Sequence, residues 1–297
     1  MPEPIANAGS VQRLVPSPGT CIACGSASRE LRFAGERGPV HRCTVCGLYA
    51  VTEPIAPEGQ AARFYETIDE SSYTSYFEDM RKAHYRRVLG EAGIARGSSL
   101  LDVGASYGWM VEVALELGFD AHGIEPGEAQ VDPAIAARIE RTTLESFDPH
   151  GRRFGVVTIW HALEHLRDPA SALRKMSTLL EPNGRLIIAI PNAEGRMYRL
   201  AELLGRSVGY QRLLSELYYF HNPNMHYWYF GPQALERLVE RCGMKCERVF
   251  TMEAFDWRTI HRRGATPAMR AALRAFGPVV AASRFTAREN LIAIVSR

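Results

Sequence analysis

An apolar strand, a glycine-bearing turn and the start of a helix follow one another in the stretch Leu100-Leu101-Asp102-Val103-Gly104-Ala105-Ser106-Tyr107-Gly108. Asp102 ends the strand, where its carboxylate can accept a hydrogen bond from a ligand ammonium group. Gly104 lets the backbone bend against a ligand, and Gly108 lets the helix begin close to it. A dinucleotide cofactor favours Gly-x-Gly-x-x-Gly here, whereas the chain has Asp-x-Gly-x-x-x-Gly. Alone, the pattern is equally typical of a tight strand-to-helix turn.

Two further strand ends carry polar side chains. The next strand ends in Gly123-Ile124-Glu125-Pro126, which puts a carboxylate 23 residues after Asp102. A carboxylate at this position can hold both hydroxyls of a ribose. A later strand runs into Trp160-His161-Ala162-Leu163-Glu164-His165. Folds in which parallel strands alternate with helices bind ligands at the carboxyl ends of the strands. We therefore assign these side chains to one predicted site.

Strands and helices alternate through the middle of the chain. Apolar periodicity predicts strands at 99–103, 119–124, 138–142, 154–160 and 185–190, and helices from 72, at 107–117 and from Asp168-Pro169. This alternation implies an α/β fold with a mostly parallel, doubly wound sheet. After Pro191 the pattern predicts two amphipathic stretches, a helix at 232–242 and strands at 245–250 and 291–295.

Four of the six cysteines form two matched Cys-x-x-Cys-Gly knuckles near the N-terminus. A two-residue gap lets one tight turn present two sulfurs, and four thiolates make a tetrahedral Zn²⁺ site. Separate free thiols or a redox pair are the alternatives, and the spacing favours zinc. We expect a structural site, remote from any chemistry, because four thiolates leave no position for water. Its predicted ligands are Cys21, Cys24, Cys43 and Cys46. Cys242 and Cys246 lack further ligands nearby, and we interpret them as packing thiols.

The composition excludes several classes of protein. A chain of 297 residues can bury a large core without disulfides. It is 46% apolar and 23% charged, which excludes a largely disordered chain. No apolar run reaches the ~18 residues of a membrane-spanning helix, and residues 1–18 do not have the pattern of a signal peptide. We therefore expect a cytoplasmic protein with reduced thiols and no membrane partner. The net charge of +2 disfavours nucleic acid as a partner.

Four blocks together resemble those of class I S-adenosylmethionine-dependent methyltransferases. They are Leu-Asp-Val-Gly-x-x-x-Gly at 101–108, Gly-Ile-Glu-Pro at 123–126, Leu-Glu-His-Leu-x-Asp-Pro at 163–169 and Leu-x-Pro-x-Gly-x-Leu-x-Ile-x-x-Pro-Asn at 180–192. The resemblance covers roughly residues 95–250 and implies a Rossmann-like, doubly wound, seven-stranded sheet. With the cysteine knuckles ahead of it, the chain looks like bacterial methyltransferases of small-molecule and glycan pathways, including the sugar C-methyltransferases.

The resemblance also implies a role for each matched position. The residues that would line the methionine and ribose of S-adenosylmethionine are Asp102, Gly104, Ala105, Gly108 and Glu125, the last of which would take the ribose hydroxyls. Those beside the adenine would be Pro126, Thr143 and Leu144. Trp160 and His161 would meet the cofactor at the end of the fourth strand.

Methyl transfer requires a nucleophile held in line with the sulfonium methyl and often a base that removes its proton. Histidine is the natural base near neutral pH, and the candidates are His161, His165, His221 and His226. Each could equally be a hydrogen-bonded structural histidine. The resemblance sets Glu164 and His165 on the acceptor side. We therefore predict His165, His226 and Glu164 as the catalytic residues, with His165 as the first choice of base.

An insertion at about 193–230 should cap the acceptor pocket or form a dimer contact, so a homodimer stays open. It ends in a segment at 218–230 in which 7 of 13 residues are aromatic. Such a segment could stack on an acceptor, form buried core or lie at an interface.

These features predict a four-cysteine zinc ribbon at 1–50, a linker and helix at 51–94, and a methyltransferase domain at 95–297. The leading hypothesis is transfer of a methyl group to oxygen or carbon of a small-molecule acceptor, such as a sugar, a glycan or a secondary-metabolite intermediate. An RNA methyltransferase that grips RNA through the ribbon is the alternative, which the balanced charge disfavours. A non-catalytic scaffold would not need both Asp102 and Glu125.

Overall fold

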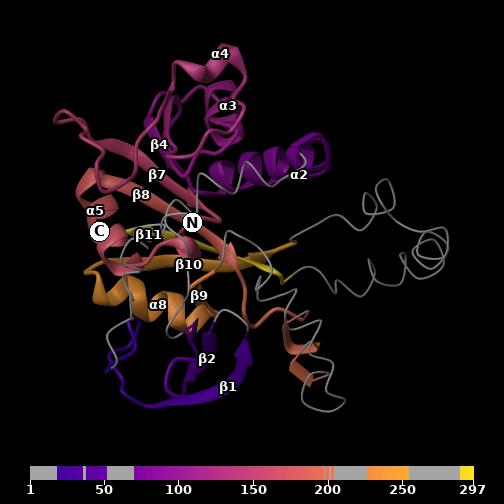
Figure 1. Cartoon of the computed structure of the whole chain (residues 1–297). Helices are drawn as coiled ribbons and strands as arrows, with labels where there is room; N and C mark the ends of the chain where they lie inside the picture. The colour runs from indigo at the N-terminus through magenta and orange to yellow at the C-terminus, as the bar shows by residue number, and fades with distance from the viewer. Residues whose placement is uncertain are drawn as a thin grey trace, which may run out of the picture.

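The computed structural model covers the whole chain and describes residues 19–35, 38–51, 70–196, 198–200, 202–203, 226–253 and 288–297 (Figure 1). Residues 52–69 of the predicted linker and helix at 51–94 lie outside these ranges. His221, most of the predicted cap and the aromatic residues at 218–225 lie outside them as well. Among the helices described, none combines the length and the apolar character needed to cross a membrane.

A seven-stranded sheet forms the centre of the described structure, in the order β10-β11-β8-β7-β4-β5-β6. Strand β11 runs antiparallel to β8 and β10, and the pairs from β8 to β6 are parallel. The chain order reverses between β4 and β7, and α/β sheets bind ligands at such a point. The strands are β4 (Ser99–Val103), β5 (Asp120–Ile124), β6 (Ile139–Glu140), β7 (Phe154–Trp160), β8 (Leu180–Pro191), β10 (Lys245–Met252) and β11 (Asn290–Ser296).

Alternate side chains of the strands fill two cores, one on each face of the sheet. On β4, Leu100 joins one core and Leu101 the other, and Ile187 and Ile188 of β8 divide in the same way. Helices α2 (Glu70–Glu91) and α3 (Trp109–Glu116) cover the first face, and α5 (Pro169–Leu179) and α8 (Pro232–Arg241) cover the second. A short helix α4 (Pro133–Ala136) precedes β6. The prediction of a Rossmann-like, doubly wound, seven-stranded sheet is therefore confirmed.

The N-terminal ribbon is an antiparallel sheet that the methyltransferase-like part of the chain completes. Strands β1 (Arg29–Gly35), β2 (Gly38–Cys43) and β3 (Tyr49–Val51) are joined by β9 (Trp228–Tyr229), in the order β1-β2-β3-β9. Cys43, Cys46 and Leu48 share one buried core with α8, and Figure 1 shows β1 and β2 next to this helix. The described aromatic residues of the segment at 218–230 are buried: Tyr227, Trp228, Tyr229 and Phe230.

Two differences between the predicted and the observed elements have a clear physical reason. Strand β8 begins at Leu180, not at Arg185, because Leu180 pairs with Phe154 and the chain bulges before Arg185 pairs with Val156. The sequence Pro-Asn-Gly at 182–184 therefore lies within a strand, ahead of the predicted start at residue 185. The predicted linker begins at Val51, yet this residue pairs with Val40 as the last residue of β3.

Candidate active site

The turn between β4 and α3 has a backbone that only glycine adopts easily. Gly104 and Gly108 have φ angles of 76° and 80°. A Cβ on Gly104 would lie 2.9 Å from the Cβ of Ala162, so the loop after β4 runs against the loop after β7. The amides of Gly104 and Ala105 both donate to the carbonyl of Ile124, at 2.9 and 3.0 Å. The ends of β4, β5 and β7 therefore meet, as the sequence predicted.

Glu125 directly follows β5, and two backbone amides hold its carboxylate. Oε2 accepts from the amide of Ser106 at 2.9 Å, and Oε1 accepts from the amide of Gly127 at 2.7 Å. Burial raises the pKa of Glu125, and these two hydrogen bonds act in the opposite direction. Since each carboxylate oxygen can accept a second hydrogen bond, the group still fits a pair of ribose hydroxyls.

Asp102 lies inside the sheet. Its Oδ1 accepts from the hydroxyl of Thr158 at 2.5 Å, and Thr158 is its partner on β7. Burial raises the pKa of Asp102 to about 7, which the Thr158 hydrogen bond opposes. Oδ2 is then the oxygen left for a ligand ammonium group.

The predicted adenine side lies at the ends of β5 and β6. Pro126 and Thr143 are exposed, whereas Leu144 is buried. Thr143 begins a turn in which its Oγ1 accepts from the amide of Ser146 at 3.2 Å. The exposed side chains of Pro126 and Thr143 can thus contact an adenine ring, while Leu144 packs into the core.

Strand β7 ends in Trp160, and His161 follows with a left-handed backbone at φ 51°. The His161 amide donates to the carbonyl of Ala189 at 2.8 Å, which keeps the chain beside β8. Trp160 is buried, and its Nε1–H has no acceptor among the described residues. A buried donor without an acceptor is costly, so a ligand that supplies one fits this position.

Three of the residues predicted as catalytic come together beyond β7; we call Glu164, His165 and His226 the Glu–His cluster. Glu164 and His165 lie on the 3₁₀ turn η1 (Leu163–His165). The rings of His165 and His226 meet edge to face, with centroids 4.5 Å apart. Nε2 of His226 is 4.0 Å from Oε1 of Glu164. One ligand atom from each of the three lies within 4.8 Å of the others, so the cluster could also hold a metal ion.

Burial governs the ionisation of this cluster. It raises the pKa of Glu164 to about 8 and lowers the pKa of His226 well below its usual value. Neither oxygen of Glu164 accepts a hydrogen bond from another described residue. Oε1 lies 3.5 Å from Nδ1 of His161, whose pKa is also lowered, first by burial and then by the charge of Arg81. At pH 7 both His161 and His226 are therefore neutral, the state that a base requires.

Helix α2 supplies site residues that the sequence analysis missed. The charge of Arg81 acts on both His161 and Glu164. The rings of His84 and Tyr85 lie 6.5 and 4.8 Å from that of Trp160. This helix precedes the first motif and carries only helical periodicity, so nothing in the sequence marked Arg81. The presence of His84 among the apolar positions of the predicted helix was the available signal.

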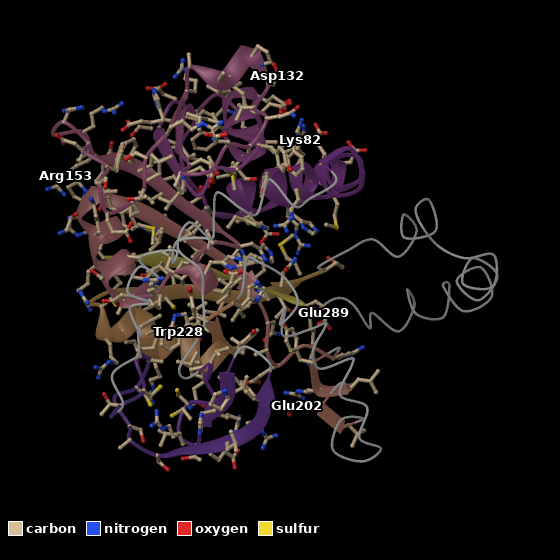
Figure 2. The ribbon with its side chains drawn as sticks, viewed as in Figure 1. Lys82, Asp132, Arg153, Glu202, Trp228 and Glu289 are labelled. Carbon is tan, nitrogen blue, oxygen red and sulfur yellow. The ribbon has the colours of Figure 1, made fainter. Side chains whose placement is uncertain are left out.

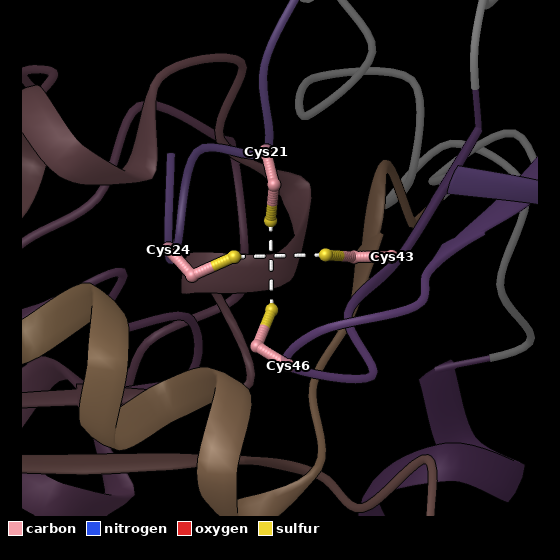
Figure 3. Close-up of side chains that lie close together, drawn as sticks. All are labelled: Cys21, Cys24, Cys43 and Cys46. Atoms are coloured by element: carbon pink, nitrogen blue, oxygen red, sulfur yellow. Dashed lines mark hydrogen bonds between the residues drawn. The ribbon is translucent and has the colours of Figure 1, made fainter. Parts of the chain in front are cut away.

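The four knuckle cysteines point their sulfurs at a common centre (Figure 3). The Cys21–Cys46 and Cys24–Cys43 sulfur distances are 3.5 and 3.6 Å, and four sulfurs around tetrahedral zinc would be about 3.8 Å apart. Gly25 and Gly47 adopt left-handed φ angles of 77° and 79° and close the two turns. The contact between Cys21 and Cys46 lowers the pKa of the Cys21 thiol and raises that of the Cys46 thiol. The residues therefore fit Zn²⁺.

The two remaining cysteines lie apart from this group. Cys242 and Cys246 are half-buried against the core, and Sγ of Cys242 donates to the carbonyl of Ala170 at 3.5 Å. Both positions agree with their interpretation as packing thiols.

A family model described as "Methyltransferase domain" matches residues 76–249. The ubiquinone biosynthesis O-methyltransferase of Pseudomonas paraeruginosa (strain DSM 24068 / PA7) is 29% identical over 142 residues, which are 45% of this chain and 61% of that protein. The chain thus spans less than two thirds of the length of this relative.

Two solved structures share the fold. The cyclopropane synthase MmaA2 from Mycobacterium tuberculosis aligns with a TM-score of 0.56 and 15% identity, over 82% of this chain and 99% of that one. The mycolic acid cyclopropane synthase CmaA1, solved with SAH and CTAB, aligns with a TM-score of 0.55 and 16% identity, over 81% and 98%. The predicted alternative of an RNA methyltransferase finds no support among these relatives.

Proposed function

We propose that this chain, which belongs to the methyltransferase-domain family and is an S-adenosylmethionine-dependent methyltransferase, methylates a hydroxyl oxygen of a small molecule. The observation that carries the proposal is the Glu–His cluster: a buried carboxyl group and two imidazoles beside the meeting point of the β4, β5 and β7 loops. The Pseudomonas paraeruginosa relative is named an O-methyltransferase, which agrees with oxygen as the acceptor atom.

The cofactor would be held by groups at three strand ends. Glu125 would bind the ribose hydroxyls, Asp102 the ammonium group, and the surface of Pro126 and Thr143 the adenine. The glycine turn at 104–108 allows close approach of the methionine portion. When bound, S-adenosylmethionine supplies an electrophilic methyl group on a positively charged sulfur.

The Glu–His cluster would activate the acceptor. A neutral imidazole of His165 or His226 accepts the proton of the acceptor hydroxyl, while that oxygen forms its bond to the methyl carbon and the carbon–sulfur bond breaks. Burial keeps Glu164 protonated near pH 7, so it can donate a hydrogen bond and orient the imidazole or the acceptor. Holding both reactants in this arrangement supplies much of the rate.

The cysteine knuckles would hold one structural Zn²⁺ through Cys21, Cys24, Cys43 and Cys46. Four sulfur ligands leave no position for water or substrate, so the ion would stabilise the ribbon and take no part in chemistry. Thiolate ligands must stay reduced, which agrees with a cytoplasmic location.

A methylation screen tests the proposed acceptor class. Purified protein is incubated with labelled S-adenosylmethionine and panels of phenols, sugar nucleotides and total RNA, and products are read by mass spectrometry. We expect label on a hydroxyl of a small molecule. Methylated RNA without a small-molecule product, or label on carbon or nitrogen only, would refute the proposal.

A further inference from the structure

The ribbon and the Glu–His cluster are joined through the two-residue strand β9. On one side, β9 pairs with β3 of the ribbon through Tyr49–Tyr229 and Ala50–Trp228. The amide of Val51 extends this ladder by donating to the carbonyl of Tyr227 at 3.0 Å. The last strand of the ribbon therefore lies directly against the segment that follows His226.

The other side of the same segment holds the turn η1. The amide of Tyr227 donates to the carbonyl of Glu164 at 2.9 Å. Nε1–H of Trp228 donates to the carbonyl of Leu166, also at 2.9 Å, and Figure 2 labels Trp228 where the ribbon meets α8. These two bonds bracket His165, so residues 227–228 fix the turn that carries two members of the Glu–His cluster.

The third member is fixed by the same segment. His226 immediately precedes Tyr227, and its imidazole is placed against both Glu164 and His165. All three members thus depend on where residues 227–228 lie. A strand of two residues is too short to hold its own position and depends on its neighbours in the sheet.

The ribbon in turn depends on its cysteines. Strand β3 has three residues, and Cys43 and Cys46 enclose the turn that leads into it. The amide of Cys43 donates to the carbonyl of Leu48, one residue before β3. Small ribbons of this kind derive their folding free energy largely from the bound metal.

We infer that the four-cysteine ribbon is a positioning element of the active site, which holds Glu164, His165 and His226 in register through β3 and β9. Its cysteines act through this sheet and touch neither the cofactor nor the acceptor. The consequence for catalysis rests on the function proposed above, whereas the consequence for structure does not. Loss of the metal should therefore loosen the Glu–His cluster more than the cofactor loops.

Amide hydrogen exchange on the full chain tests the structural link without any acceptor. The chain is compared as loaded with Zn²⁺, after removal of metal by a chelator, and after reloading with Zn²⁺. On metal removal we expect exchange at the amides of Val51 and Tyr227 to accelerate by about tenfold or more. The amides of Gly104 and Ala105 in the loop after β4, which donate to the carbonyl of Ile124, should lose less protection than that of Tyr227. Unchanged protection at Tyr227 in the metal-free chain would overturn the inference.

Kinetics test the catalytic consequence. Metal removal should lower kcat by about tenfold or more, with the Kd for S-adenosylmethionine changed by less than about threefold. Trp228→Phe keeps the metal ligands and an aromatic ring but removes the hydrogen bond to the carbonyl of Leu166. It should therefore lower kcat and shift the apparent pKa of the kcat–pH profile at full zinc content. Cys246→Ser, outside the knuckles, is the matched control and should change neither. A Trp228→Phe protein with the kcat and pH profile of the wild type would count against the link.

The two experiments also separate the two proposals. If the wild type methylates no acceptor but Tyr227 loses protection with the metal, the proposed function fails and the positioning link stands. If the wild type is active and metal removal alters neither exchange nor kcat, the link fails and the proposed function stands.

Discussion

His165 and His226 differ in burial although their rings are in contact. His226 is buried and His165 is half-buried, so His165 has the better access to an acceptor, and His226 can accept the proton directly or through its neighbour. We expect His165→Ala or His226→Ala to lower kcat by ~10²–10⁴ with little change in cofactor affinity, as loss of a general base does. His150→Asn, at an exposed position, is the control. Near-normal kcat in both variants would mean that the acceptor ionises unaided.

The buried carboxyl group of Glu164 makes stability depend on pH. Its folded pKa of about 8 lies above the unfolded value, so the folded state binds more protons and stability falls as pH rises toward 8. Histidines with lowered pKa values act in the opposite direction only below about pH 6.5. Between pH 6.5 and 8 the wild type should therefore lose up to about 2 kcal/mol relative to Glu164→Gln. Urea unfolding of both proteins at several pH values measures the difference, and parallel profiles would show that Glu164 ionises normally.

Glu125 offers the sharpest test of the cofactor site. Removal of its carboxylate should cost ~1.5–3 kcal/mol of cofactor binding, or about tenfold to a hundredfold in affinity. Because Glu125 also accepts from the amides of Ser106 and Gly127, thermal unfolding must accompany the titration. Calorimetric titration of Glu125→Ala with S-adenosylmethionine, with exposed Glu128→Ala as control, gives the answer. Equal affinities would remove Glu125 from the ribose site.

At the scale of single elements, two terms contribute to the cost of replacing the glycine that leads into α3. One is the strain of a left-handed backbone, and the other is the crowding of the added Cβ. Gly108 and Gly118 both have left-handed φ angles, but a Cβ on Gly108 would meet the side chains of Ile139 and Ile135 at 2.6 and 2.7 Å, whereas Gly118 has open space. Left-handed strain alone costs ~1–2 kcal/mol, and forced repacking adds ~1–3 kcal/mol. Gly108→Ala should therefore destabilise the chain more than Gly118→Ala, and it alone should weaken cofactor binding. Equal urea midpoints would mean that the two isoleucines move aside freely.

Elements with a strong local pattern were predictable from the sequence. Strands β4 and β7 were predicted residue for residue, because both are continuous apolar runs that end in polar or glycine-bearing turns. The Asp168 N-cap and Pro169 located the start of α5, and in the structure Asp168 accepts from the amide of Ser171. The bulge that begins β8 was missed, since its Pro-Asn-Gly sequence is that of a turn and only pairing with β7 reveals a strand.

The candidate site was predictable where each residue follows a strand. Glu164 and His165 were predicted from the family resemblance, which sets them on the acceptor side beyond the strand at 154–160. His226 was predicted as a histidine within the aromatic segment at 218–230. The sequence could not show Arg81, whose charge acts on His161 and Glu164 from a helix outside the motifs. Nor could it show β9, because a two-residue strand has no periodicity and exists only through its partners on the ribbon and on η1.

At the scale of the whole molecule, the ribbon is packed into the larger fold at several places. It contributes Cys43, Cys46 and Leu48 to the core beneath α8. It also forms an ion pair between Arg32 and Glu202 at 3.1 Å (Figure 2). These contacts, together with the β3–β9 ladder, mean that the predicted boundary at residue 50 separates two parts of the sequence that share one core.

Because the ribbon and the seven-stranded sheet share one core, removal of the metal should lower the free energy of unfolding of both. Exposure of Leu48 and of other side chains in the shared core should cost about 2 kcal/mol or more, because burial of one such side chain contributes ~1.5–3 kcal/mol. We therefore expect the urea midpoint followed by far-UV circular dichroism to fall when Zn²⁺ is removed and to fall likewise in Cys43→Ser. It should fall less in Cys246→Ser, which changes one half-buried packing thiol and no metal ligand. Elemental analysis should find about one zinc per chain in the wild type and the Cys246 variant. If the metal-free chain unfolded at the same urea concentration as the loaded one, the ribbon would be an independent unit, and its core contacts with α8 would contribute nothing to the stability of the sheet.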